Sequence, residues 1–174
     1  PFAAVHLLFI NRRTDSLPAI GLGLEPHYHE VMEEKPRPKS ESILTGTFVK
    51  TILIQGIVIG AMTMIAYHTG LTESEACART MAFATLCLSR LVHGFNSKAA
   101  VPVIFKKRFF DNKYLIGAFF IGLLLLCAVL LIPPLQSVFQ VVPLDWFKLL
   151  MIFVLAVANL FIIQAIKAIL HRRK

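Results

Sequence analysis

The stretch YLIGAFFIGLLLLCAVLLI, residues 114–132, decides the fold class because it holds 19 consecutive residues without a charged side chain. An apolar run of about 18 residues or more is typical of a helix that crosses a bilayer. The run ends at Pro133-Pro134, and proline cannot continue a helix because it lacks a backbone N–H. The sequence therefore predicts a membrane protein with a transmembrane helix at this position.

Four further apolar segments accompany this run. Together, the predicted helices cover residues 2–24, 47–67, 76–95, 114–132 and 146–170. We expect an all-α, polytopic membrane bundle of five transmembrane helices in one domain, 1–174. The first and third segments contain charges, among them Asp15 and Arg90, that a helix facing only lipid does not tolerate. Protein is therefore expected to cover these two helices.

Composition supports this fold class and limits the partners. Hydrophobic residues make up 56% of the chain, whereas soluble proteins average roughly 45–50%. The net charge of +8 could also suggest a nucleic-acid partner. Nucleic-acid-binding surfaces do not need long apolar runs, so we expect no nucleic acid and instead a lipid bilayer.

Basic residues are concentrated in alternate loops. Lys and Arg occur in the predicted loops 25–46 and 96–113 and in the C-terminal HRRK, but not in residues 70–75 or 133–145. Because basic loops stay in the cytoplasm, we expect both basic loops and the C-terminus to be cytoplasmic. Five crossings then place the N-terminus outside.

The stretch NRRTDSLP, residues 11–18, is the most polar part of the first segment. On a helix with about 3.6 residues per turn, Asn11, Thr14, Asp15 and Pro18 share one face. This face offers an amide oxygen, a hydroxyl and a carboxylate, which are the hard ligands that Ca²⁺ prefers. The spacing fits equally well a polar patch that only holds helices together. A carboxylate inside the membrane nevertheless favours a functional site.

Pro18 strengthens the hypothesis of a cation site. Its ring clashes with the carbonyl of Thr14, four residues earlier, and a carbonyl freed in this way can coordinate a cation. Interrupted helices form ion sites near the middle of the membrane in transporters. Arg12 and Arg13 have no assigned role, and they could reach a neighbouring carboxylate or a water-filled path, or mark a chain that does not transport.

Two other sets of residues have alternative interpretations. Arg90 is either a side chain that snorkels toward the cytoplasm or a partner of Asp15 that fills the space of a second cation. His27 and His29 could bind a metal, but a pair of histidines fits ordinary loop residues better. The three cysteines show neither metal-binding nor disulfide spacing.

At this point the sequence resembles the type II P-type ATPases. LLFIN at 7–11 and TDSLPAIGLGLEP at 14–26 are similar to their sixth transmembrane segment, which carries Asn-x-x-Thr-Asp followed by Leu-Pro-Ala. MEEKPRP at 32–38 resembles the Met-x-x-Pro-Pro-Arg loop that follows. The resemblance spans the chain as segments six to ten, although the later segments are similar mainly in length and order.

The resemblance implies Ca²⁺ as the transported ion, with Asn11, Thr14 and Asp15 as ligands. Calcium pumps of the sarcoplasmic reticulum type use a Glu, six residues before an Asn on the eighth segment, for a second calcium. Arg90 occupies that place here, six residues before Asn96. Bacterial calcium pumps also carry Arg there and are thought to move one calcium per cycle against protons. The resemblance therefore implies one site and a bacterial plasma membrane.

The resemblance also shows what this chain lacks. The family's Asp-Lys-Thr-Gly-Thr phosphorylation motif does not occur in residues 1–174, and the chain begins without Met inside an apolar stretch, as expected of a fragment. The resemblance places ATP and Mg²⁺ in domains outside this sequence. We expect the parent protein to be a P-type calcium-transporting ATPase, the remainder of that pump to be the partner, and this chain alone not to hydrolyse ATP.

Three alternatives stay open. The chain could be a purely structural bundle, the membrane domain of a pump for another cation, or an unrelated secondary transporter with a broken helix. A secondary transporter would normally show internal symmetry, and the sequence shows none. Arg12 and Arg13 also depart from the apolar pair that the family places between Asn and Thr.

Overall fold

The computed structural model describes residues 4–11, 16–25, 45–98 and 110–172, and within these ranges the regular structure is helical. The first predicted segment forms two short helices, α1 (Ala4–Phe9) and α2 (Ser16–Gly23). The remaining helices are α4 (Gly46–Leu71), α5 (Glu75–Ser97), α6 (Lys113–Leu131), α7 (Pro133–Phe139) and α8 (Trp146–Arg172).

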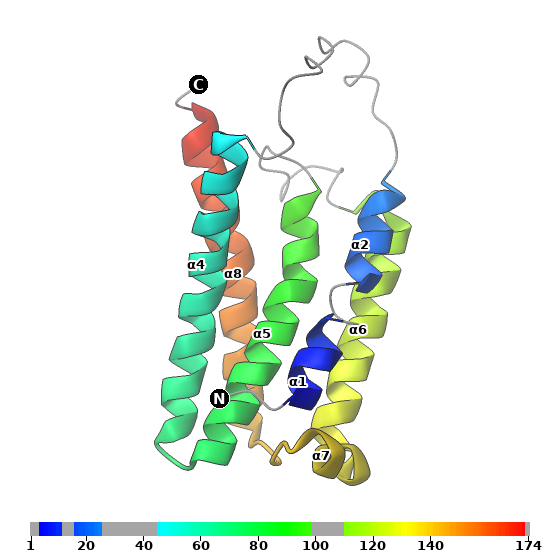
Figure 1. The fold of residues 1–174 in the computed structure, drawn as a ribbon, viewed down its shortest axis with the longest axis vertical. Coiled ribbons are helices and arrows are strands. Elements are labelled where there is room, and N and C mark those ends of the chain that lie inside the picture. The colour runs from blue at the N-terminus through cyan, green and yellow to red at the C-terminus, as the bar shows by residue number, and fades with distance from the viewer. Residues whose placement is uncertain (1–3, 12–15, 26–44, 99–109, 173–174) are drawn as a thin grey trace.

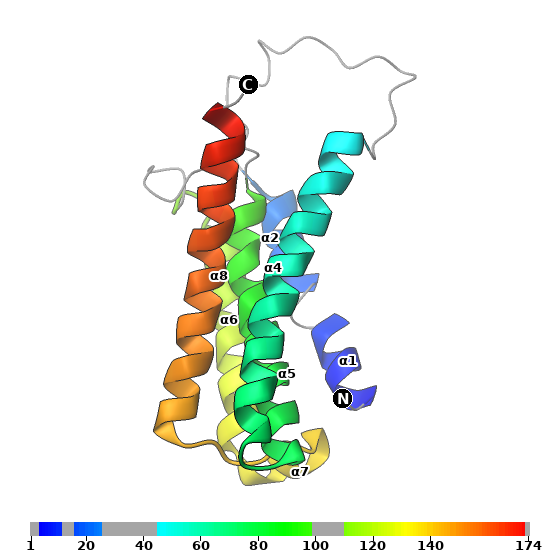
Figure 2. The same ribbon diagram turned by 90° about the vertical axis from the view of Figure 1, so that its left-hand side faces the viewer.

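The four long helices form an upright bundle around α5 (Figures 1 and 2). In Figure 1, α4 and α8 lie on one side of α5, and α1, α2 and α6 lie on the other. Helices α5 and α8 run in the same direction, opposite to α4 and α6. The short α7 lies across the end of the bundle where α6 finishes.

Helix α5 is the centre of the bundle because its neighbours cover most of its surface. Of its 23 residues, 16 are buried, including polar side chains such as Thr85, Ser89 and Asn96. The helix begins at Ser74, whose hydroxyl accepts a hydrogen bond from the backbone N–H of Cys77 at 3.0 Å. A helix enclosed by protein need not be apolar, which agrees with the expectation that the third segment is covered.

Three helices in the described part of the chain are long and apolar enough to cross a membrane, Phe48–Leu71, Lys113–Leu131 and Trp146–Leu170. The structure therefore supports an all-helical membrane protein. It confirms three candidate spans in the described residues, not the five that the sequence predicts. Helix α5 is long enough but less apolar than these three. The first segment is divided between α1 and α2.

The prediction of a loop over residues 133–145 is wrong in its first half, where α7 lies. Pro133 and Pro134 do end α6, but they also occupy the first turn of α7. A proline is tolerated there because the N–H groups of a first turn have no partner inside the helix. Helix α7 ends at Gln140, which adopts the left-handed conformation with φ 52°.

Candidate cation site and its surroundings

The first segment departs from α-helical geometry at the end of α1. Ile10 and Asn11 continue from α1 in a π-helical conformation, and α2 begins at Ser16. The Ser16 hydroxyl donates a hydrogen bond to the carbonyl oxygen of Asn11 at 3.4 Å and so links the two helices. Single π turns inside helices are frequent at functional sites. The chain is thus locally irregular where the sequence predicts ion ligands.

Only part of the predicted ligand set lies among the described residues. Asn11 is described, and it is exposed at the end of α1. Thr14 and Asp15 lie outside the described residues, as do Arg12 and Arg13. The prediction that Asn11, Thr14 and Asp15 bind one cation therefore stays a prediction.

Aromatic contacts hold α1 in place. The His6 ring stacks on Phe83 of α5 with ring centroids 4.4 Å apart. Phe9 meets Phe83 edge to face at 5.8 Å and Phe139 of α7 at 5.2 Å. The nitrogen Nε2 of His6 also lies 2.5 Å from the carbonyl oxygen of Phe139. These contacts fix the first half of the broken segment to α5 and α7.

A different set of contacts holds α2. Gly21 lies so close to α6 that an added Cβ would be 2.9 Å from the Cα atom of Leu115. The buried Asn112 accepts a hydrogen bond from the N–H of Leu115 at 2.9 Å, and its Nδ2 donates to the carbonyl of Gly21 at 2.7 Å. The same Nδ2 lies 2.6 Å from the Oε2 of Glu25. One side chain therefore caps α6 and attaches the end of α2 to it.

An ion pair extends this attachment to α5. The Glu25 carboxylate lies 3.4 Å from the Nζ of Lys98, and the Lys98 side chain is fully enclosed. Lys98 directly follows the last turn of α5. The two halves of the broken segment are consequently anchored at different heights of the bundle, α1 on α5 and α7, and α2 on α6 and the end of α5.

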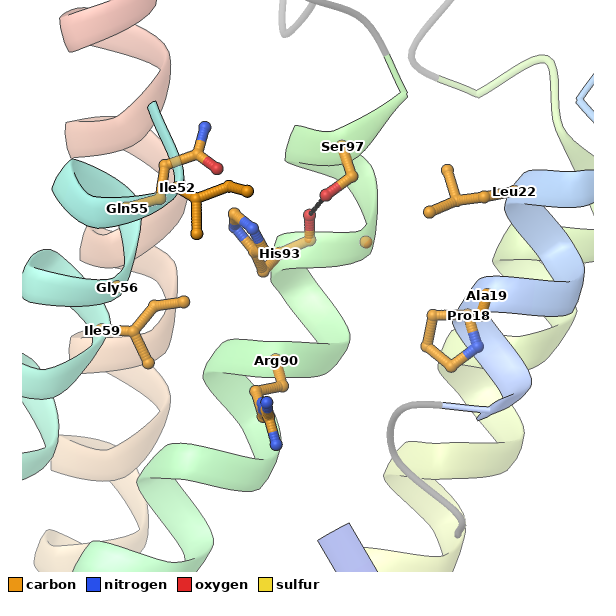
Figure 3. Close-up of a pocket in the computed structure, with 11 residues that line it drawn as sticks. Pro18, Ala19, Leu22, Ile52, Gln55, Gly56, Ile59, Arg90, His93 and Ser97 are labelled. Carbon is orange, nitrogen blue, oxygen red and sulfur yellow. Dashed lines mark hydrogen bonds between the residues drawn. The ribbon is translucent and has the colours of Figure 1, made fainter. Parts of the chain in front are cut away.

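A groove of about 410 Å³ opens beside α2. Pro18 and Leu22 of α2 form one wall, and Gln55 of α4 belongs to the other (Figure 3). Arg90 and His93 project from α5 into this region, with the His93 ring directed toward α4 (Figure 3). The groove thus places a cationic side chain and several hydrogen-bonding groups next to the helix that follows the break.

Sequence reasoning missed the attachment made by Glu25, Lys98 and Asn112. A signal was present, because Asn112 precedes an apolar run and asparagine is a preferred N-cap residue. The described residues contain no group of three or more His, Cys, Asp or Glu that could hold a metal. His27 and His29 lie outside those residues.

The helical bundle, with three helices long and apolar enough to cross a membrane, defines the class of polytopic membrane domains. The chain matches the family model described as cation transporting ATPase, C-terminus, over residues 1–169. The chain belongs to this family of C-terminal membrane domains of P-type ATPases.

Similar curated proteins come from several bacteria. Calcium-transporting ATPase 1 of Bacillus cereus is 38% identical over 181 residues, which cover 91% of this chain and 20% of that protein. A calcium-transporting ATPase of Listeria monocytogenes is 39% identical over 145 residues, covering 81% of this chain and 16% of that protein. That of Bacillus subtilis is 37% identical, with 84% and 17% covered. This chain therefore spans a fifth or less of the length of these relatives.

Proposed function

We propose that this chain is the part of an ATP-driven calcium pump that supplies ion ligands from its broken first segment. The observation that carries the proposal is the π-helical break at Asn11 between two separately anchored helices. A break fixed on both sides can hold oxygen ligands in a defined geometry, and a binding site needs that preorganisation. Asn11, Thr14 and Asp15 are the proposed ligands.

Calcium is the proposed ion for two reasons. The relatives from Bacillus and Listeria are named calcium-transporting ATPases. An amide, a hydroxyl and a carboxylate also form an oxygen ligand set of the kind that Ca²⁺ takes. We further propose that ATP and Mg²⁺ bind to the remainder of the pump. The proposed location is a bacterial plasma membrane, with the N-terminus outside and the C-terminus in the cytoplasm.

The groove beside α2 is the proposed place where the remainder of the pump completes the site. Arg90 and Gln55 bring polar groups to the wall of this groove. In the most apolar window of α4, only 6% of residues are buried inside this chain. A further helix packed here would cover both features.

Arg90 is proposed to limit the pump to one calcium. Its guanidinium keeps its positive charge at any physiological pH. Placed in the groove next to α2, this charge repels a second cation and neutralises a carboxylate when the pump is empty.

The decisive experiment replaces Asp15 in the full-length pump. We expect Asp15→Asn to reduce ATP-driven ⁴⁵Ca²⁺ uptake into sealed vesicles at least tenfold, because the substitution removes the only negative charge among the proposed ligands. Asp145→Asn is the matched control, since Asp145 is an exposed carboxylate directly before α8 and should leave uptake unchanged. Full uptake by a folded Asp15→Asn pump would leave the purely structural bundle as the better account.

A second experiment tests Arg90. We expect Arg90→Glu to raise the number of calcium ions moved per ATP, or to change the accompanying proton movement, because a carboxylate would replace a fixed positive charge. Arg90→Lys keeps the charge and should keep the ratio. An unchanged ratio in Arg90→Glu would contradict the proposed role.

The same vesicles separate the remaining alternatives. A well-folded parental pump that takes up no ⁴⁵Ca²⁺ would indicate another cation, or a site that Arg12 and Arg13 have disabled. Substituting both arginines with Leu distinguishes these outcomes, because restored uptake would assign the loss to the arginines.

A further inference from the structure

Helices α5 and α8 lie side by side in a fixed register. The Nε2 of Gln164 donates to the Oδ1 of Asn96 at 2.8 Å. The Nζ of Lys167 donates to the carbonyl oxygen of Asn96, and all three residues are buried. Residues of α8 in this pairing are therefore 68 to 71 positions later in the chain than their neighbours on α5.

The same register places two polar side chains without hydrogen-bond partners at the same level along α5 and α8. Asn159 is level with the turn of α5 that carries Ser89, because α5 and α8 run in the same direction. Both residues are fully enclosed, with 0% of their surfaces exposed. The Nδ2 and Oδ1 of Asn159 and the Oγ of Ser89 have no hydrogen-bond partner among the described protein groups. Buried polar groups of this kind are rare in native proteins, and each needs an explanation.

A third unsatisfied group lies one turn further along α5. The Nδ1 of His93 is buried and has no hydrogen-bond partner in the described part of the chain. Its ring is directed toward Gln55 of α4 (Figure 3). Ser89 lies two turns before Asn96, on the face of α5 that meets α8, and His93 lies one turn beyond Ser89 with its ring toward α4.

A small cavity of about 10 Å³ lies between α4 and α8. Its walls are mainly aliphatic, but Gln55 of α4 and Lys167 of α8 also line it and offer a water molecule polar partners. Ile163 is one turn beyond Asn159 on the same side of α8. A polar cavity of about 10–15 Å³ is large enough for one water molecule.

We propose that α4, α5 and α8 enclose a hydration site in which water molecules bridge Ser89, His93 and Asn159 and continue to the cavity beside Gln55 and Lys167. Water fits these groups because it donates and accepts, as the amide of Asn159 and the hydroxyl of Ser89 both require. A bound cation would meet the positive charge of Lys167 and does not fit. The site centres on the contact between α5 and α8, with His93 also lining the groove beside α2, and it does not depend on which ion is transported.

The test compares thermal unfolding of full-length pump variants. Leu has nearly the shape of Asn but no hydrogen-bonding groups. At a dry site, Asn159→Leu removes two unsatisfied groups and should raise the midpoint temperature. At a hydrated site it removes the partners of the water and should lower the midpoint by several degrees. A raised or unchanged midpoint would overturn the proposal.

Controls exclude a simple packing effect. Ser97→Ala removes an exposed hydroxyl of α5 that bonds only within its own helix, and it should leave the midpoint unchanged. Ser89→Ala combined with Asn159→Leu should lower the midpoint by less than the sum of the single changes, because both remove the same bridge. Strict additivity would count against shared water.

Direct observation gives an independent readout. A map of the full-length pump at a resolution that shows ordered water should contain density within hydrogen-bond distance of Asn159 and Ser89. Well-ordered side chains with no density between them would overturn the proposal even if the unfolding data agreed with it.

Discussion

The two sides of α5 differ in how far this chain completes them. On the side facing α8, Asn96 bonds to both Gln164 and Lys167, and the surrounding side chains are buried. On the other side, a groove of about 410 Å³ lies between α2, α4 and α5, and Arg90 lines it. The side facing α8 is closely packed within this chain. We propose that the groove takes a helix from the remainder of the pump.

The glycines show a second contrast, between helix surfaces that touch another helix and surfaces that do not. An added Cβ at Gly21 or Gly122 would meet α6 or α5 at 2.9 Å or less, so both glycines allow helices to touch. Gly56, which lines the groove, has nothing within 4 Å of such a Cβ. The comparison therefore predicts opposite responses to the same small substitution, depending on whether another helix packs against the glycine.

The largest stability loss is expected for Asn112→Ala, which removes the side chain that attaches α2 to α6. Loss of an N-cap costs about 1 kcal/mol. Leaving the Gly21 carbonyl and Glu25 without this donor adds about 1–3 kcal/mol, because both groups are partly or fully buried. Thermal unfolding of the pump should show a total loss of about 2–4 kcal/mol.

Asn112→Ser separates the two contributions of this side chain. Serine keeps a cap acceptor but is too short to reach both Gly21 and Glu25, so we expect an intermediate loss. Equal stability of Asn112→Ala and the parental pump would show that α2 does not depend on this attachment.

A smaller loss is expected for Gly21→Ala. The new methyl would press on backbone atoms of Leu115 at 2.9 and 3.1 Å, and a backbone cannot move aside as a flexible side chain can. Overpacking of this kind costs about 1–3 kcal/mol. We also expect a lower calcium affinity, because displacing α2 displaces the break before it. Titration of calcium-dependent ATPase activity measures this change.

Gly23→Ala is the matched control in the same helix. Nothing lies within 4 Å of a Cβ at this exposed position, so both stability and affinity should be retained. A loss of equal size in the two variants would show that the close contact between Gly21 and Leu115 is not the cause.

Local patterns in the sequence were sufficient to predict a helix where the chain is uniformly apolar. The predicted range 114–132 differs from the observed α6, Lys113–Leu131, by one residue at each end, because an unbroken apolar run is bounded by Asn112 and two prolines. Helix α7 was missed because Pro133-Pro134 was interpreted only as a stop. The same residue that ends one helix is well placed to begin the next.

Contacts between distant parts of the chain could not be predicted in this way. Asn112 and Glu25 are 87 positions apart, and nothing in either local pattern indicates that they meet. The polar residues of α8 are a different case. Asn159, Gln164 and Lys167 interrupt an otherwise apolar helix, and such residues are expected to face other helices rather than lipid. The polar residues of α8 therefore indicated a contact with another helix, but they did not identify that helix as α5.

The variants with the smallest expected effect on stability give the sharpest test of the groove beside α2. Gly56→Ala and Gly117→Ala each replace a helical glycine whose new Cβ would meet nothing within 4 Å. Both should gain up to about 1 kcal/mol from helix propensity. Only Gly56 lines the groove, so only Gly56→Ala should hinder a helix from the remainder of the pump and reduce ATP-driven uptake. If both variants transport at the parental rate, lipid rather than protein fills the groove. The groove would then not be a contact site for the remainder of the pump.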